Sequence, residues 1–253
     1  MTTLVISCAS IQGATLLAMA ARRRAWEVHY GAPEPSKLLG KVALYSSTPD
    51  APVYVRRYGL ALIEPPLDLL ARVPMSLLLR RVEYATWGDL GRVSQPLFIK
   101  PADPLNKVFD AGVYRERGQI RTSIALQTPV LVSEVVEWTA EYRCFVLDGR
   151  IETASPYMLG GRPLAYQREV VAVPAPVQAV CRQLFDEVEL PPAFVADVGL
   201  IDDRGWAIVE FNPCWCAGLL SSDFGKVLNV LKRACRRRAE LAAGDRRWVL
   251  DRG

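Results

Sequence analysis

Apolar and polar positions near the start of the chain follow a strand period, then a helix period, then a strand period again. The apolar run 4–8 predicts a buried strand, 11–24 predicts a helix with a basic end, and 26–30 alternates as a second strand does. This order of strand, helix and strand indicates an α/β unit. Short strands are also expected at 41–45 and 52–58, and short helical segments at 67–71 and 76–81.

The pattern changes after Pro96, where strands dominate. A short strand is expected at 97–101, followed by a polar loop and a further strand at 129–133. The dipeptide Asp148-Gly149 is a strong signal for a tight hairpin between alternating segments at 141–147 and 150–154. Helices are expected at 177–188 and 226–243.

A second hairpin is predicted between Phe194 and Pro213. If the chain reverses about its turn signal at 202–205, Asp197 lies opposite Glu210, and Asn212 shares that face. Like charges directly opposite one another destabilise a sheet, whereas Mg²⁺ takes oxygen ligands and would remove the repulsion. The alternative is a hairpin whose acids are only solvated, and a slip of one residue would turn one acid to the other face.

The composition is that of a folded, moderately charged protein. Of the 253 residues, 51% are hydrophobic and 23% are charged, and the net charge is +4. This allows a core spread over one large domain or roughly two or three lobes, and it implies neither disorder nor a strongly polyanionic partner. Arginine clusters could contact nucleic acid, but they are also typical of solvated helix ends; they lie at 22–24, 80–81, 236–238 and 246–247. No nucleic-acid partner is expected.

The numbers and positions of the cysteines and of the histidine argue against several kinds of metal and catalytic site. Most of the six cysteines lie in apolar runs, which suits buried thiols in a reducing compartment. Cys214 and Cys216 lack the C-x-x-C spacing of zinc and redox sites, and His29 as the single histidine argues against a histidine metal site or a Ser-His-Asp triad. The apolar stretch 4–21 is interrupted by polar residues, so no membrane partner is expected and the cytoplasm is the expected location.

Four motifs in a fixed order carry a family resemblance. They are Phe98–Pro101 with its lysine, Val132–Trp138, Glu141–Gly149 and Val209–Pro213. Over residues 95–235 the chain resembles the ATP-grasp superfamily, and in particular its clade named for two arginines and a lysine. The resemblance implies an ATP-grasp fold of α+β lobes behind an N-terminal α/β lobe. The expected limits are 1–95 for that N-terminal lobe, 96–155 for the small ATP-grasp lobe and 156–253 for the large one.

The resemblance also implies a nucleotide site. Lys100 matches the strand lysine that contacts the nucleotide phosphates, and Glu141 matches the acid that binds the ribose hydroxyls. The adenine would lie at the hinge between the lobes. There the resemblance implies an acceptor at Glu134, an apolar surface from Val135 and Val136, and a backbone N–H donor at Glu137.

Asp197, Glu210 and Asn212 fall on the metal set of the family. The resemblance implies that Glu210 bridges two Mg²⁺ ions, with Asp197 and Asn212 completing the two sides. The ions would neutralise the ATP phosphates and orient the terminal phosphoryl group, and no protein nucleophile would be needed.

Three arginines are candidates for catalysis. Arg143 is predicted on the pleat face of Glu141, where its guanidinium could meet the phosphates or an acyl phosphate, or could pair with a neighbouring acid. Arg80 and Arg81 lie in a segment that resembles the clade's arginine-containing segment, and either one could reach the site. Cys214 and Cys216 stand where relatives carry small residues, and either line the substrate end or pack beside Trp215.

The implied function is an ATP- and Mg²⁺-dependent carboxylate–amine (or carboxylate–thiol) ligase that forms ADP through an acyl phosphate. Its partners would be a small-molecule or peptide carboxylate and an amine acceptor. The alternatives are a nucleotide-binding ATP-grasp module without ligase activity and an ATP-grasp phosphotransferase that acts on a hydroxyl or another acceptor.

Overall fold

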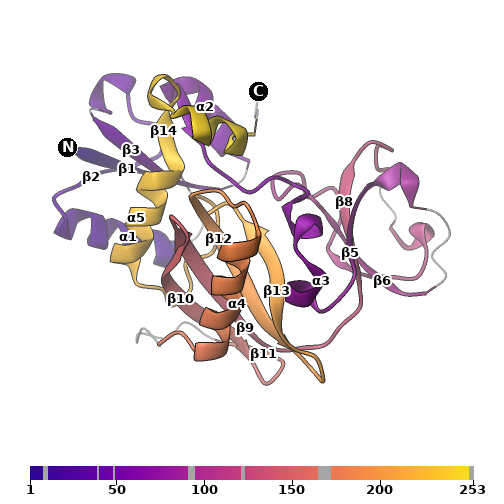
Figure 1. Ribbon diagram of the computed structural model, residues 1–253. Coiled ribbons are helices and arrows are strands. Elements are labelled where there is room, and N and C mark those ends of the chain that lie inside the picture. The colour runs from indigo at the N-terminus through magenta and orange to yellow at the C-terminus, as the bar shows by residue number, and fades with distance from the viewer. Residues whose placement is uncertain are drawn as a thin grey trace.

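The computed structural model describes residues 1–7, 11–38, 40–47, 49–90, 95–120, 123–164 and 172–250. Cys8, at the end of the first predicted strand, lies outside these ranges. Three groups of elements follow one another from left to right in Figure 1: an N-terminal α/β lobe, a central sheet with its helices, and a small sheet. Within the described ranges, no helix is long and apolar enough to cross a membrane.

The N-terminal lobe is built on a parallel three-stranded sheet in the order β2-β1-β3. Its elements are β1 (Thr2–Ser7), α1 (Ile11–Arg23), β2 (Glu27–Tyr30) and β3 (Lys41–Ser46). The predicted α/β opening is therefore confirmed. A crossover helix is what joins parallel neighbours such as β1 and β2.

The strand predicted at 52–58 is wrong, because this segment is the helix α2 (Ala51–Tyr58). Its buried residues Ala51, Tyr54, Val55 and Tyr58 recur at the helical spacing of three and four, whereas the exposed arginines fall between them. Proline is tolerated in the first turn, and Gly59 ends the helix with a φ of 59°, in the left-handed region.

The last predicted helix is also too long. The helix α5 spans Phe224–Ala234, and the chain then forms β14 (Cys235–Arg237), which pairs antiparallel with β4 (Leu60–Leu62). The basic residues of this segment fit a helix end, but the backbone of β4 needs a hydrogen-bonding partner and takes it from residues 235–237.

The central sheet is antiparallel, with the order β11-β10-β9-β12-β13. The strands are β9 (Trp138–Leu147), β10 (Arg150–Leu159), β11 (Arg162–Pro163), β12 (Ala193–Ile201) and β13 (Gly205–Asn212). Both predicted hairpins are confirmed. One face packs on α4 (Ala175–Glu187) and the other on α5, which also touches β3 of the N-terminal lobe (Figure 1).

The small sheet is antiparallel, with the order β5-β8-β6-β7. Its strands are β5 (Val82–Thr86), β6 (Leu97–Pro101), β7 (Gly112–Tyr114) and β8 (Pro129–Glu134). Before it lie the 3-10 turn η2 (Leu69–Arg72) and the single-turn helix α3 (Met75–Leu78). Further 3-10 turns span Pro35–Lys37, Trp87–Asp89, Arg117–Gln119, Arg238–Glu240 and Ala243–Trp248.

The small sheet contains the strands between residues 82 and 134, and the central sheet contains the strands between residues 138 and 212. The division into lobes at 1–95, 96–155 and 156–253 stays a prediction. The hinge run 134–138 connects β8 of the small sheet to β9 of the central sheet, so the space between the two sheets lies beside it.

Candidate active site

A row of three charged side chains crosses the central sheet. Arg143 on β9 pairs in register with Asp197 on β12, which pairs in turn with Glu210 on β13. The predicted opposition of Asp197 and Glu210 is confirmed, although the turn is not centred where the sequence placed it. Ile201 pairs with Gly205, and an irregularity at Val209 restores the pairing of the two acids.

Asp197 is fully buried, with 0% of its side chain exposed, and is held by Arg143. Nε of Arg143 donates to Oδ1 of Asp197 at 2.9 Å and Nη2 donates to Oδ2 at 2.6 Å, which is a bidentate pair. Burial raises the pKa of Asp197 to about 6, against the opposing effect of Arg143. Of the two roles open to Arg143, the structure shows the ion pair.

Glu210 is held by three neighbours. Lys100 on β6 of the small sheet donates from Nζ to Oε2 at 2.5 Å, and Asn212 donates from Nδ2 to Oε1 at 2.8 Å. Nη2 of Arg143 lies 3.8 Å from Oε1. Burial alone would raise the pKa of Glu210, but the Lys100 ammonium, the Asn212 amide and Arg143 together hold that pKa well below its usual value.

The three predicted metal ligands therefore converge. Asn212 also lies 3.4 Å from Oδ2 of Asp197 through its Nδ2 atom. Two carboxylates and one amide supply the oxygen chemistry that Mg²⁺ prefers, and the set fits an ion that takes its remaining ligands from phosphates. No cluster of three or more His, Cys, Asp or Glu side chains that could hold a metal occurs among the described residues.

A cavity of about 450 Å³ opens between the small sheet and the central sheet. The structure brings Lys100 and Glu210 together at this cavity with Glu141 and three of the predicted hinge residues, Glu134, Val135 and Val136. Its lining includes Arg80, Lys100, Glu134, Val135, Val136, Trp138, Glu141, Tyr157 and Glu210. Glu137 has an exposed side chain outside this lining, and its carbonyl accepts a hydrogen bond from the Asp202 N–H at 3.1 Å.

Two of the acids in this cavity differ in their surroundings. Glu134 receives a hydrogen bond at 2.6 Å from Arg204, which lowers its pKa. Burial raises the pKa of Glu141 to about 7, and the negative charges of Asp197 and Glu210 add to the effect. Of these two acids, Glu141 is therefore the one whose pKa lies near neutrality.

Tyr157 is a site residue that the sequence reasoning missed. Its hydroxyl donates to Oε2 of Glu141, and its ring lies 5.5 Å from Cζ of Arg143. The strand β10 was expected to end at 154, but it continues to Leu159. Pro156 pairs with Tyr142 and Met158 pairs with Glu141, so Tyr157 is an extra residue that a bulge re-aims towards the cavity. The proline inside the strand was the signal for this irregularity.

The structure separates the two neighbouring arginine candidates. Arg80 is buried and lines the cavity, with Cζ 4.9 Å from the Trp138 ring, and burial lowers the pKa of its guanidinium to about 10. Arg81 is exposed and lines an adjoining hollow of about 870 Å³, which shares Glu134 and Val135 with the cavity. Of this pair, Arg80 is therefore the arginine that lines the cavity between the two sheets.

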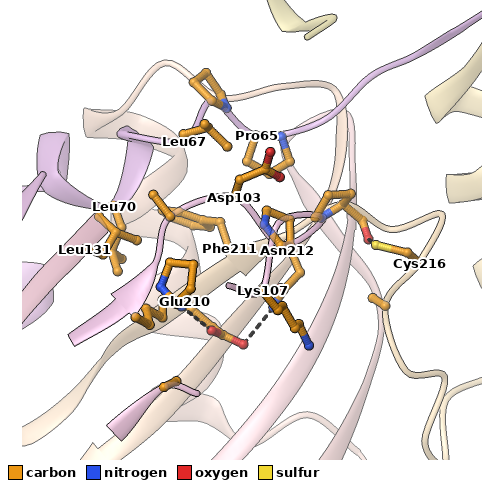
Figure 2. Close-up of a pocket in the computed structure, with 18 of the residues that line it drawn as sticks. Pro65, Leu67, Leu70, Asp103, Lys107, Leu131, Glu210, Phe211, Asn212 and Cys216 are labelled. Atoms are coloured by element: carbon orange, nitrogen blue, oxygen red, sulfur yellow. Dashed lines mark hydrogen bonds and ion pairs between the residues drawn. The ribbon is translucent and has the colours of Figure 1, made fainter. Parts of the chain in front are cut away.

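A second cavity of about 440 Å³ continues from the first, because Leu70, Lys100, Leu131 and Glu210 line both. Figure 2 shows Leu70 and Leu131 on its left and Cys216, in the loop after β13, on its right. Arg143, Asn212 and Lys107 also line it. Cys214 is fully buried in the core whereas Cys216 lines the cavity, so only one of the two thiols packs away from it.

Comparison with known proteins agrees with this geometry. Residues 77–230 match the model of an ATP-grasp domain family, the second family of the clade named for two arginines and a lysine. The structure is similar to that of the D-cycloserine synthetase DcsG, with a TM-score of 0.58 at 13% identity, covering 92% of this chain and 99% of that one. It is also similar to a RimK domain ATP-grasp protein from Sphaerobacter thermophilus, with a TM-score of 0.51 at 12% identity, covering 92% and 97%.

A third similar structure is the ATP-grasp ligase PsnB complexed with a minimal precursor, with a TM-score of 0.50 at 14% identity, covering 90% of this chain and 97% of that one. At these identities the likeness shows the fold alone. No curated protein matches the sequence.

Proposed function

Because the chain belongs to this second family of the two-arginine-and-lysine clade of ATP-grasp domains, we propose that it is an ATP- and Mg²⁺-dependent ligase. In the proposed reaction a carboxylate oxygen attacks the γ-phosphorus of ATP, which gives an acyl phosphate and ADP. An amine (or a thiol) then attacks the acyl carbon, and phosphate leaves as the new bond forms and the nucleophile loses a proton. The carboxylate is a small molecule or a peptide.

One observation carries this proposal: two continuous cavities share Lys100 and Glu210, which come from the two facing sheets and contact each other. A nucleotide in the first cavity would direct its phosphates towards this pair and leave the second cavity for the carboxylate. Positioning and charge stabilisation of this kind supply most of the catalysis in phosphoryl transfer.

The nucleotide would be held along the first cavity. Val135 and Val136 offer apolar surface to the adenine, beside the hinge backbone of Glu134 and Glu137. Glu141, oriented by the Tyr157 hydroxyl, would accept hydrogen bonds from the ribose hydroxyls.

The charged end would exchange partners when ATP enters. Lys100 pairs with Glu210 and Arg143 pairs with Asp197, so two cations and two anions neutralise one another. Phosphate oxygens would attract both cations and so release the two carboxylates. The carboxylates, with Asn212, would then hold Mg²⁺, which when bound neutralises phosphate charge and polarises the transferred group.

The experiment that tests the proposal is calorimetric titration of ATP with Mg²⁺ into the wild type and into an Asp197→Asn/Glu210→Gln variant. Binding that weakens in the variant supports the site, and a folded wild type without binding contradicts it. Mixtures of carboxylates are then screened for ADP release in the presence of hydroxylamine, which converts an acyl phosphate into a hydroxamate. A phosphorylated acceptor without hydroxamate would indicate the phosphotransferase instead, and binding without turnover would indicate the nucleotide-binding module.

We place the reaction in the cytoplasm. The supporting observation is that the buried cysteines Cys144, Cys181, Cys214 and Cys235 form no disulfide, as is usual in a reducing compartment.

A further inference from the structure

The β12–β13 hairpin is irregular at the position that places Glu210. Asp197 pairs with Glu210, but Val198 pairs with Ile208, which leaves Val209 as an extra residue on β13. With the same turn and no extra residue, Val209 would lie opposite Asp197. Glu210 would then move to the face of Ala196, which packs in the apolar core beneath α4. The bulge is therefore what keeps both acids on one face.

Arg80 binds the backbone of this bulge. Its Nη1 donates to the Ile208 carbonyl and its Nη2 donates to the Val209 carbonyl, each at 2.7 Å. Consecutive carbonyls of a regular strand point to opposite sides, so a single guanidinium that reaches both matches the bulged geometry. Because β13 is the end strand in the order of its sheet, carbonyls on its outer side need a donor from elsewhere.

Arg80 is itself firmly placed. Only 5% of it is exposed, and its guanidinium lies over the Trp138 ring at 4.9 Å. The preceding residue is also docked on the hairpin, because the Leu79 carbonyl accepts a hydrogen bond from Nη1 of Arg204 at 2.9 Å. The segment between α3 and β5 is thus fastened to the β12–β13 hairpin at two points.

We propose that Arg80 is a positioning residue that fixes the bulge at Val209 and so keeps Glu210 on the face of Asp197. The proposed function enters only through the use of Glu210 for Mg²⁺, since the strand register exists without any ligand. Arg81 is a matched control, because it is adjacent and exposed and its backbone N–H, at 3.4 Å, contacts Glu134 instead of β13.

The test compares Arg80→Met, Arg80→Lys and Arg81→Met by their affinity for a non-hydrolysable ATP analogue with and without Mg²⁺. In Arg80→Met we expect the Mg²⁺-dependent gain in affinity to fall about tenfold or more, well beyond any loss of affinity measured without Mg²⁺. Arg80→Lys should recover only part of the gain, because an ammonium cannot donate as a planar fork. Arg81→Met should keep both affinities.

An equal loss of affinity with and without Mg²⁺ would overturn the proposal, because it would mean that Arg80 contacts the nucleotide directly. An unchanged Mg²⁺-dependent gain in a folded Arg80→Met protein would overturn it as well. If Arg80→Met does not fold, the same two criteria apply to Arg80→Lys.

A second measurement needs no nucleotide. Cross-strand contacts between Asp197 and Glu210 are followed by NMR in the ligand-free proteins, and we expect them to weaken in Arg80→Lys and to persist in Arg81→Met. Deleting Val209 in the Arg80→Lys background should restore them, because the regular register then pairs the two acids. Contacts that persist in Arg80→Lys would overturn the proposal. A wild type that binds no ATP would contradict the proposed function and leave this register test intact.

Discussion

The two ends of the continuous cavity are lined by different kinds of side chain. The hinge end presents Val135 and Val136 beside two acids, Glu134, which is paired with Arg204, and Glu141, whose pKa is raised by burial to about 7. The opposite end holds charges that are already paired, Lys100 with Glu210 and Arg143 with Asp197. The hinge end can accept an apolar ring as it stands, whereas the charged end must exchange internal partners for phosphate and metal. The affinity for ATP should therefore come from burial of the adenine at the hinge end. At the charged end it should come from the replacement of internal ion pairs by contacts with phosphate and metal.

Glu210→Gln should have the largest effect and should abolish Mg²⁺-dependent ATP turnover while the fold survives. The amide keeps the shape of the side chain but removes the charge that would hold the metal. ADP release measured against Mg²⁺ concentration checks this. Glu137→Gln at the exposed hinge position is the control and should leave turnover unchanged. Normal turnover in Glu210→Gln would remove Glu210 from the metal site.

Asp197→Ala should destabilise the protein by roughly 3–5 kcal/mol, because it leaves the Arg143 charge without its buried partner. The free energy of unfolding in urea measures this loss. The double variant Asp197→Ala/Arg143→Met should regain part of the stability, since no unpaired charge remains. If the double variant is no more stable than Asp197→Ala, the pair is not what stabilises this end.

Lys100→Ala should weaken ATP binding by roughly 1.5–3 kcal/mol, the range for a hydrogen bond to a charged group. Calorimetric titration gives the value, and Lys226→Ala, at an exposed position of α5, serves as the comparison. Unchanged ATP affinity in Lys100→Ala would mean that the charged end does not contact the phosphates.

A further expected effect is a dependence of stability on pH in the ligand-free protein. The pKa of Glu141 is raised from 4.5 to about 7 and that of Asp197 from 3.8 to about 6, in both cases mainly by burial. Between these values the folded state binds more protons than the unfolded state at Glu141 and Asp197, so the free energy of unfolding should fall as pH rises from about 5 through about 7. Glu210, whose pKa is lowered, opposes this effect below about pH 5 and is mostly ionised in both states above it.

Urea unfolding midpoints at about pH 5 and about pH 7.5 test this sign, and Glu141→Gln should flatten the slope. A wild-type stability that increases over this interval would contradict the assignment. It would mean that Glu141 is ionised in the folded protein, and the hinge end would then be as charged as the other.

Turn signals and the alternation of apolar residues led to correct predictions wherever burial of one face of a strand pair decided the structure. The alternation around Asp148-Gly149 and the two apolar runs flanking 202–205 predicted both hairpins, because a buried face tolerates only one register. The same logic failed at 52–58, where apolar residues fit both periods over a short window and the helical face was the one that packed. It also failed at 235, where the need of β4 for a partner ended the last helix.

The sequence by itself determined most of the order of the elements and the shared face of Asp197 and Glu210, because these depend on side-chain period. The family resemblance, which depends on motif order along the chain, implied that Lys100 and Glu141 join them. Only the tertiary structure decided that Arg80 and not Arg81 lines the cavity between the two sheets, that Tyr157 turns towards Glu141, and that Val209 is the extra residue that aligns the acids. The physical reason is that a bulge and a buried guanidinium are selected by backbone groups that meet only after the sheets have packed. No pattern along the chain records which donor will reach those carbonyls.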